Sequence, residues 1–405
     1  MESSDLKKNE GKVHDLNALL KKVSAYSGRK RKQVIYGVYD KNAQPFLTRI
    51  DDFMIDHSHV PLQEKAYFFH LLAVMIDAGI PLIQSVKMLA NRTKHERFRR
   101  ILDTCAFSIG QGKRFSEAMS RSPDVFGEME IGVVISGEAA GNMEKMLFKL
   151  SEQLDKSHEL QMKLVTASVY PIAVLVVLLV VAAGMLIWII PGLVDLLREG
   201  GLEDKDFPFA TKFLIGLSAA FANYWWAIAF GAVIAFLIFK VYIGSDSGRF
   251  QWDLFKLKFP IIGTLRRRVL VLRFVSMLGI LIDSGLPVVQ ALKIIATSLS
   301  SELYRLKTWE VIAKVQSGEK ISMTLAESPF LFDETVTQML GIAEQSASIG
   351  MISNKIASHY DREIDNSLKR LTSLFEPIMI VFVGVTVAIL ALAILTPIFQ
   401  LSSLV

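Results

Sequence analysis

The sequence repeats itself once, and this internal duplication constrains the fold more than any other feature. Residues 66–197 align without a gap with residues 272–403 at one fixed offset of 206 positions, so that Pro81 corresponds to Pro287 (287 minus 81). Two copies of this length are too few and too long for a solenoid, whose repeating units are about 20 to 50 residues. The sequence therefore predicts two related domains in one chain.

Three apolar stretches without a charged residue predict three transmembrane helices. Apolar residues make up 51% of the chain and charged residues 21%, which fits either a large core or a membrane protein. The distribution decides between them, because the uncharged run from Ala167 to Ile190 would extend about 36 Å as a helix, enough to cross a bilayer. A second uncharged run covers 213–239, and a third begins at Pro377. We expect the helices at 167–190, 222–243 and 377–400.

The duplication and the charges together predict the membrane topology. Both copies end in an apolar helix, so two copies inserted in the same direction need one further crossing, which 222–243 supplies. Six Lys and Arg residues lie in 244–270, against three in 191–221. Because cytoplasmic loops carry the excess of positive charge, we expect 244–270 and the N-terminus in the cytoplasm and the C-terminus on the opposite side.

Within each copy the apolar residues recur at helical spacing, without the alternation that indicates strands. Gly79 followed by Pro81 is typical of one helix ending and the next beginning, and Gly285 with Pro287 repeats this pattern. Gly141 marks a further break before the last helix of the first copy. The expected fold is an all-α membrane protein with two cytoplasmic helical bundles of about six helices each and three transmembrane helices.

These features divide the chain into successive segments. Pro171 and Pro377 occupy equivalent positions at the point of membrane entry, where a kink would redirect each span relative to its bundle. The predicted segments are a basic N-terminal segment (1–60), the first bundle (61–166), a transmembrane helix (167–190), an outer loop (191–221), a transmembrane helix (222–243), the second bundle (244–376), a transmembrane helix (377–400) and a short tail (401–405).

The N-terminal segment 1–60 lies outside the duplication. Its apolar residues Val13, Leu16 and Leu20 lie at helical spacing among lysines, and a basic run follows at 29–32. A solvated tail, a helix lying on anionic lipid and a docking helix for a partner all fit this pattern. Residues 33–50 also have the composition of a small β-hairpin.

No pattern of residues indicates an enzyme. The glycine-containing run that begins at Gly110 has one residue between its glycines and places Arg114 where a phosphate-binding loop needs Ser or Thr. The seven histidines form no catalytic triad or metal cluster. We therefore expect no catalytic activity, no cofactor and no bound metal. The single Cys105 is predicted to be a buried and inert thiol.

The uncharged runs 167–190, 213–239 and from Pro377 onward contain no charged residue, which argues against a transporter, because intramembrane transport sites generally need one. They do contain a stripe of small residues, Ala227, Gly231 and Ala235, which permits close helix packing within the chain or between subunits. Chance placement toward lipid is the alternative interpretation of this stripe.

Glu138 and Glu344 are the residues most open to a functional interpretation. Each lies just before the break that precedes the final helix of its copy. A carboxylate there can accept hydrogen bonds from backbone N–H groups and cap a helix N-terminus. A contact or cation site between the bundles is the alternative, although acids alone do not define a metal site.

Two motifs carry a resemblance to a known family. The first is KAYFFHLLAVMIDAGIPLIQSVKMLA from Lys65, and the second is GEAAGNMEKML from Gly137, followed by a span that begins with Tyr170 and Pro171. Together with the duplication and the three spans, they make residues 65–400 resemble the bacterial inner-membrane platform protein of type II secretion and type IV pilus machines. The second copy departs from the second motif, with Ala347 in place of Gly141.

This resemblance implies a multi-pass protein of the bacterial inner membrane, with its C-terminus in the periplasm. It implies a non-enzymatic platform that couples a hexameric cytoplasmic ATPase to the polymerisation of pilin or pseudopilin subunits. The resemblance further implies a homo-oligomer that contacts other inner-membrane assembly proteins and membrane lipid and does not bind nucleic acid directly. The candidate coupling positions are Gly79, Pro81, Glu138, Gly141, Pro171, Gly285, Pro287, Glu344 and Pro377. A small-solute permease or accessory membrane subunit is the alternative function.

Overall fold

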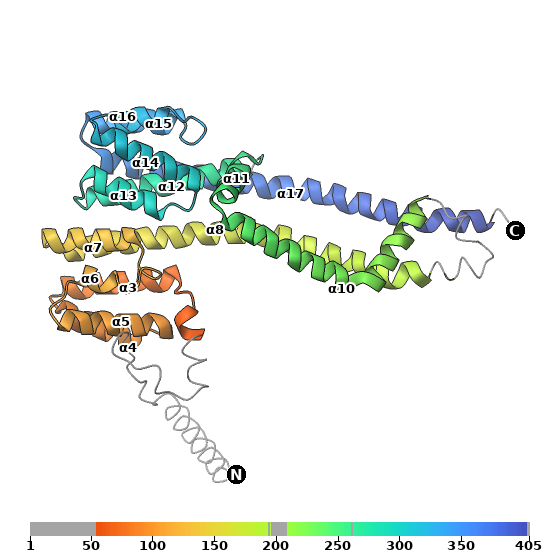
Figure 1. Cartoon of the computed structure of the whole chain (residues 1–405), viewed down its shortest axis with the longest axis horizontal. Coiled ribbons are helices and arrows are strands. Elements are labelled where there is room, and N and C mark those ends of the chain that lie inside the picture. The colour runs from red at the N-terminus through yellow and green to blue at the C-terminus, as the bar shows by residue number, and fades with distance from the viewer. Residues whose placement is uncertain (1–53, 193–194, 196–208, 261, 403–405) are drawn as a thin grey trace, which may run out of the picture. The chain divides into compact units, whose positions relative to one another are not determined.

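The computed structural model describes residues 54–192, 195, 209–260 and 262–402, and every regular element in these residues is a helix (Figure 1). The all-helical prediction is therefore confirmed for this part of the chain. Most of the N-terminal segment 1–60, including the predicted β-hairpin, lies outside the described residues.

Each copy contains the same succession of helices. The helices of the first copy are α3 (Leu62–Asp77), α4 (Leu82–Arg92), α5 (Glu96–Gly110), α6 (Phe115–Met119), α7 (Glu128–Ala140) and α8 (Met143–Gly184). Those of the second copy are α12 (Ile262–Asp283), α13 (Val288–Ser298), α14 (Glu302–Gln316), α15 (Ile321–Ala326), α16 (Glu334–Gln345) and α17 (Ile349–Ser402). The π-helical turn η2 (Met185–Ile189) follows α8 at the end of the first copy, and α10 (Phe209–Gly244) and α11 (Asp246–Lys258) lie between the copies.

The helix bounds repeat at the offset of the sequence duplication. Both ends of α13 lie 206 positions after those of α4 (288 minus 82 and 298 minus 92), and both ends of α14 lie 206 positions after those of α5 (302 minus 96 and 316 minus 110). The long final helices α8 and α17 also begin 206 positions apart (349 minus 143). The duplicated sequence therefore specifies a duplicated series of helices.

The break predicted from glycine and proline in the second copy is a Schellman motif. Gly285 has a φ of 87°, in the left-handed region that an L side chain disfavours. The amide of Leu286 donates to the carbonyl of Leu281 at 3.1 Å, and the amide of Gly285 donates to that of Ile282 at 2.9 Å. Pro287 then lies at the N-cap of α13, where its fixed φ suits a helix start.

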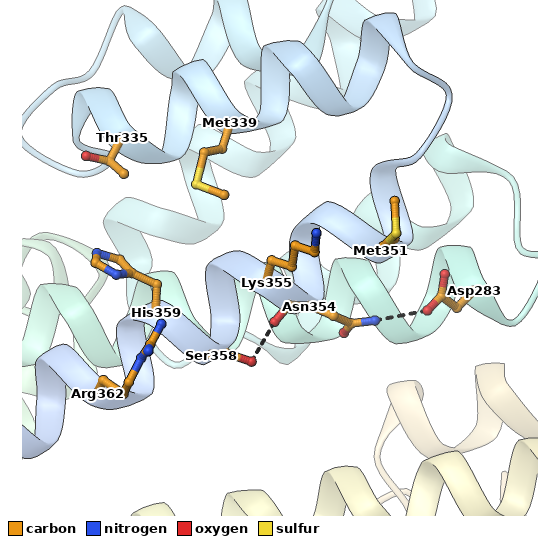
Figure 2. Close-up of a pocket in the computed structure, with 9 residues that line it drawn as sticks. All are labelled: Asp283, Thr335, Met339, Met351, Asn354, Lys355, Ser358, His359 and Arg362. Atoms are coloured by element: carbon orange, nitrogen blue, oxygen red, sulfur yellow. Dashed lines mark hydrogen bonds between the residues drawn. The ribbon is translucent and has the colours of Figure 1, made fainter.

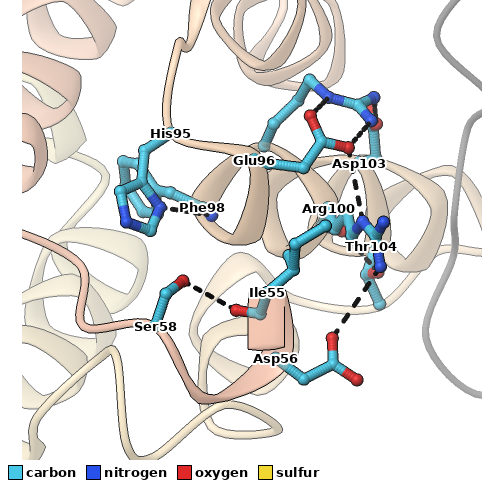
Figure 3. Close-up of polar contacts among 10 residues, drawn as sticks. Ile55, Asp56, Ser58, His95, Glu96, Phe98, Arg100, Asp103 and Thr104 are labelled. Carbon is cyan, nitrogen blue, oxygen red and sulfur yellow. Dashed lines mark hydrogen bonds and ion pairs between the residues drawn. The ribbon is translucent and has the colours of Figure 1, made fainter. Parts of the chain in front are cut away.

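The chain divides into two compact units, and the first comprises residues up to 60 together with 79–125. Among its described residues, α4 packs on α5 and α5 packs on α6, with Val86, Phe98 and Leu102 completely buried between them. An ion pair joins the segment before α3 to α5 (Figure 3), because Arg100 of α5 lies 3.9 Å from Asp56. Arg100 also lies 3.3 Å from Glu96 of its own helix.

The second unit comprises 61–78 and 126–405. In it α3 packs along α8, and the equivalent helices α12 and α17 pack along each other. Helix α7 contacts α12 and α13, and α8 contacts α12 and α17, so helices of the first copy pack on helices of the second. For this reason the compact units do not follow the copies, and the predicted bundle boundaries stay a prediction.

Two helices among the described residues are long and apolar enough to cross a membrane, Met143–Gly192 and Ile349–Ala388. They contain the first predicted span and the beginning of the third. The rest of the chain does not cover the apolar stretches of these helices: Val180 is 66% exposed and Ile380 is 67% exposed. The second predicted span lies in α10, which has a non-helical residue at Tyr224 and is not confirmed as a span.

Candidate functional site

The described residues contain no group of three or more His, Cys, Asp and Glu side chains that could hold a metal ion. Cys105 is buried in α5, and this burial raises the pKa of its thiol to about 12. A thiol with so high a pKa stays protonated at neutral pH and is a poor nucleophile.

The predicted helix breaks occupy equivalent, accessible positions in both copies. Gly79 and Pro81 are exposed before α4, and Gly285 and Pro287 are exposed before α13. The φ of Gly79 is 79°, in the left-handed region that favours a residue without a Cβ. The structure thus presents two similar turns to solvent, one in each compact unit.

Glu344 caps a helix of its own copy. Its carboxylate accepts hydrogen bonds from the backbone amides of Ile321 at 2.6 Å and Ser322 at 3.1 Å, and from the hydroxyl of Ser322. These amides belong to the first turn of α15, where helical N–H groups have no partner within the helix. The carboxylate therefore joins the end of α16 to the start of α15.

The equivalent residue of the first copy, Glu138, is half-buried in the last turn of α7. The helix ends at Gly141, whose φ of 67° is left-handed, and the amide of Asn142 donates to the carbonyl of Gly137 at 3.1 Å. An added Cβ at Gly137 would lie 3.1 Å from Cβ of Met146, so this turn is tightly packed as well.

The second copy makes the same turn without the glycine. The amide of Ser348 donates to the carbonyl of Ala343 at 2.9 Å, as in the first copy, but the left-handed position is occupied by Ala347 with a φ of 48°. Ala347 is the one non-glycine residue with a positive φ among the described residues. A left-handed alanine is disfavoured by about 1–2 kcal/mol, so the turn before α17 is strained.

One polar contact of the first copy was missed by the sequence analysis. The Lys65 ammonium lies 2.6 Å from the Glu130 carboxylate, and both residues are buried between α3 and α7. Glu130 also accepts a hydrogen bond from the amide of Gly127. Burial raises the pKa of Glu130, although the charge and hydrogen bond of Lys65 oppose this rise. The offset of the duplication places Val271 and Val336 at these positions in the second copy, and both valines are buried.

An open cleft lies beside each final helix. The cleft of the second copy, of about 750 Å³, lies between α16 and α17 (Figure 2), and Met339, Lys355 and Arg362 are among the residues that line it. The cleft of the first copy, of about 650 Å³, lies along α8 with His70 of α3 at its side. Several lining positions are equivalent in the two copies: Lys145 and Met351, Phe148 and Asn354, Lys149 and Lys355, Glu152 and Ser358, and Lys156 and Arg362.

The two clefts differ in charge, because α8 contributes four acids to one while the other has a single acid. The acids of the α8 cleft are Glu144, Glu152, Asp155 and Glu159. In the α17 cleft the acid is Asp283, whose carboxylate accepts a hydrogen bond from the Asn354 amide at 3.0 Å (Figure 2). The duplicated surfaces are therefore chemically distinct.

The duplication also appears in comparison with known proteins. The family model of the type II secretion system (T2SS), protein F, matches residues 68–191 and again residues 274–397, which begin 206 positions apart (274 minus 68). The chain belongs to the type II secretion system protein F family. Each match of the T2SS protein F model covers most of the helices of one copy and includes its apolar segment.

Relatives of this T2SS protein F family member are named for pilus assembly or secretion. The type IV pilus assembly protein PilC of Thermus thermophilus is 32% identical over 340 residues, covering 84% of this chain and 83% of the relative. The type IV pilus assembly protein TapC of Aeromonas hydrophila is 31% identical, covering 82% of this chain and 80% of the relative. The type II secretion system protein F of Pseudomonas aeruginosa is 28% identical, covering 82% of each.

The remaining predicted positions of this T2SS protein F family member lie in its long helices. Pro171 is inside α8 and Pro377 is inside α17. The small-residue stripe lies on α10, where Ala227 is half-buried and Gly231 and Ala235 are exposed. Among the described residues no atom outside the adjoining part of α10 lies within 4 Å of the position of a Cβ on Gly231, so the role of this stripe in helix packing stays a prediction.

Proposed function

We propose that this chain is the inner-membrane platform of a type IV pilus or type II secretion machine. The observation that carries the proposal is the continuity of each final helix. Helix α8 packs Leu150 and Leu154 in the folded core and runs on into an exposed apolar stretch, and α17 does the same with the equivalent Ile356 and Tyr360. A continuous helix is a stiff connection, so movement of the cytoplasmic part is transmitted to the membrane segment.

The membrane arrangement proposed here has three spans. The candidate spans in α8 and α17 run in the same direction if both copies insert alike, and α10 then supplies the return crossing. The positive charges of 244–270 favour a cytoplasmic location for that segment. This places the N-terminus and the two helical bundles, at 61–166 and 244–376, in the cytoplasm and the C-terminus in the periplasm.

The energy for assembly comes from partners in this proposal. A hexameric assembly ATPase contacts the cytoplasmic bundles, and pilin or pseudopilin subunits leave the membrane beside the spans, with homo-oligomers of this chain and other inner-membrane assembly proteins forming the platform. The exposed turns at Pro81 and Pro287 and the clefts beside α8 and α17 are the surfaces offered to these partners. The names of the relatives, which describe pilus assembly and secretion, support this assignment.

Deletion of the chain from its host tests the proposal. The deletion strain should lose its surface fibres or the secretion of its exported proteins, and the native chain should restore them. Glu138→Ala and Pro81→Ala should insert in the membrane normally and fail to restore assembly. Normal fibres and normal secretion in the deletion strain would contradict the platform function, and full restoration by both variants would contradict the assignment of these two residues.

The permease alternative makes a different prediction. A permease moves solute across vesicles that contain the purified chain alone, without any ATPase. We expect no such flux, because the uncharged runs 167–190, 213–239 and from Pro377 onward contain no charged residue that could bind a polar solute or relay a proton. Solute uptake that depends on the chain would establish the permease function instead.

A further inference from the structure

An ion cluster joins the two final helices of the chain. The Lys163 ammonium of α8 lies 3.3 Å from a carboxylate oxygen of Asp361 and 3.1 Å from one of Asp365, both on α17. It also lies 3.4 Å from the carboxylate of Glu159 on its own helix. One lysine thus binds two acids of the neighbouring helix at the point where α8 and α17 meet.

The duplication gives each final helix the same set of charges. Helix α8 has Asp155, Glu159 and Lys163, and the residues of α17 at the offset of 206 (361 minus 155, 369 minus 163) are Asp361, Asp365 and Lys369. Residues four positions apart lie on one side of a helix. Each helix therefore has a lysine that can bind a neighbour and two acids that can receive a neighbour's lysine.

Only half of these contacts is made within the chain. Lys163 binds the acids of α17, but Lys369 and Asp155 have no ion-pair partner among the described residues, and both are exposed. Nor does the lysine next to Asp155 neutralise it, because Lys156 lies 2.7 Å from Glu152. Helix α8 thus has an unoccupied acidic position and α17 an unoccupied lysine.

The acceptor position on α8 is accessible. Asp155 and Glu159 line the open cleft of about 650 Å³ beside α8, which can admit a side chain from another molecule. Glu159 is 67% exposed even though it contacts Lys163. A long lysine side chain on a helix points back toward the N-terminus of that helix, which suits acids four and eight positions earlier on a parallel neighbour.

We propose that Lys369 of one copy of this chain binds Asp155 and Glu159 of a second copy, repeating between chains the contact that Lys163 makes within one. The partner is a second copy because the complementary charges are those of the repeat itself. The contact is head-to-tail, with α17 of one copy beside α8 of the next, and such contacts form a ring when the rotation closes. Exposed ion pairs are individually weak, so this contact fixes register and partner while the apolar spans supply most of the affinity.

This inference rests on the oligomeric platform proposed above and names the surface that forms it. A cross-linking experiment can test the surface separately. Two differently tagged full-length chains are expressed in one membrane, one with Lys369→Cys and the other with Asp155→Cys, and are treated with a short bis-maleimide reagent. Cys105 is buried and can stay in place. We expect a cross-linked species that carries both tags.

The matched control is the contact within the chain. Lys163→Cys and Asp361→Cys in one chain should cross-link internally and leave the apparent mass unchanged. When the same two substitutions are divided between two chains, they should give no species with both tags. A species with both tags from Lys163→Cys and Asp361→Cys in separate chains would overturn the assignment. So would the lack of such a species from Lys369→Cys and Asp155→Cys.

Charge reversal gives a second test. Lys369→Glu should weaken association of the detergent-solubilised chain about fivefold, and Asp155→Lys in the partner chain should restore it. Lys293→Glu, at an exposed lysine of α13 away from the clefts, should leave association unchanged. An unaltered association of Lys369→Glu would overturn the proposed surface. If the native chain is an oligomer in that case, the platform stands with a different interface, whereas a monomeric native chain contradicts the oligomeric platform as well.

Discussion

Lys65 and Glu130 form an ion pair, 2.6 Å long, in the interior of the first copy, where the second copy has two valines. Removing one partner of a buried pair leaves an uncompensated charge and costs about 3–5 kcal/mol, whereas replacing both by apolar residues is often neutral. We expect Lys65→Val and Glu130→Val each to destabilise the chain strongly and the double variant to recover most of the loss. Thermal unfolding of the full chain in lipid nanodiscs measures this. A double variant that is no more stable than the less stable of the two single variants would contradict the expectation.

The same carboxyl predicts a pH dependence. Burial raises the pKa of Glu130 above the ordinary value of 4.5. A carboxyl with a raised pKa binds its proton more tightly in the folded state, so its contribution to stability falls as the pH rises from about 4.5 through the folded-state pKa. The native chain should therefore lose stability relative to the double valine variant over this range. If the stabilities of the two proteins changed with pH in the same way, this predicted loss would be contradicted.

The turn before α17 should be improved by restoring the glycine of the first copy. Ala347 has a φ of 48°, whereas the equivalent Gly141 has one of 67°. Ala347→Gly should stabilise the chain by about 1 kcal/mol, because relief of the left-handed strain exceeds the entropic cost of a glycine. Gly141→Ala should destabilise it by a similar amount. The measurement is the thermal midpoint of each variant in nanodiscs, and a loss of stability in Ala347→Gly would refute the strain.

Glu344 should hold the start of α15 in place. Glu344→Ala leaves the amides of Ile321 and Ser322 without their acceptor, at a cost of about 1–2 kcal/mol. Hydrogen exchange of these amides should become faster, while exchange in α13 should not change. Glu319→Ala, an exposed acid before the same helix, is the matched control and should have no effect. Unchanged protection of the two amides in Glu344→Ala would show that other groups cap α15.

The sequence predicts the local features of this fold better than its long-range contacts. The break at Gly285 and Pro287 was predicted because left-handed glycine and N-terminal proline act within a few residues. Glu344 was predicted to cap a helix, but the identity of α15 was not accessible, since its amides lie 22 and 23 positions earlier in the chain. The ion pair of Lys65 and Glu130 spans 65 positions and was missed for the same reason.

The duplication does contain one indication of the contact between Lys65 and Glu130. Comparison of the two copies at the offset of 206 shows where a charged pair is replaced by a pair of valines, and such a paired change indicates contact in the interior. The division into compact units could not be predicted in this way, because α7 and α8 pack on helices of the other copy. Packing between copies depends on surface shapes that periodicity does not encode.

Cross-linked capture from native membranes tests whether the chain is an assembly platform. A tag on the N-terminus of the full chain allows its neighbours to be recovered and identified by mass spectrometry, with an unrelated tagged membrane protein as control. We expect recovery of a hexameric assembly ATPase together with pilin or pseudopilin subunits. Reproducible absence of both, with other partners recovered, would contradict it.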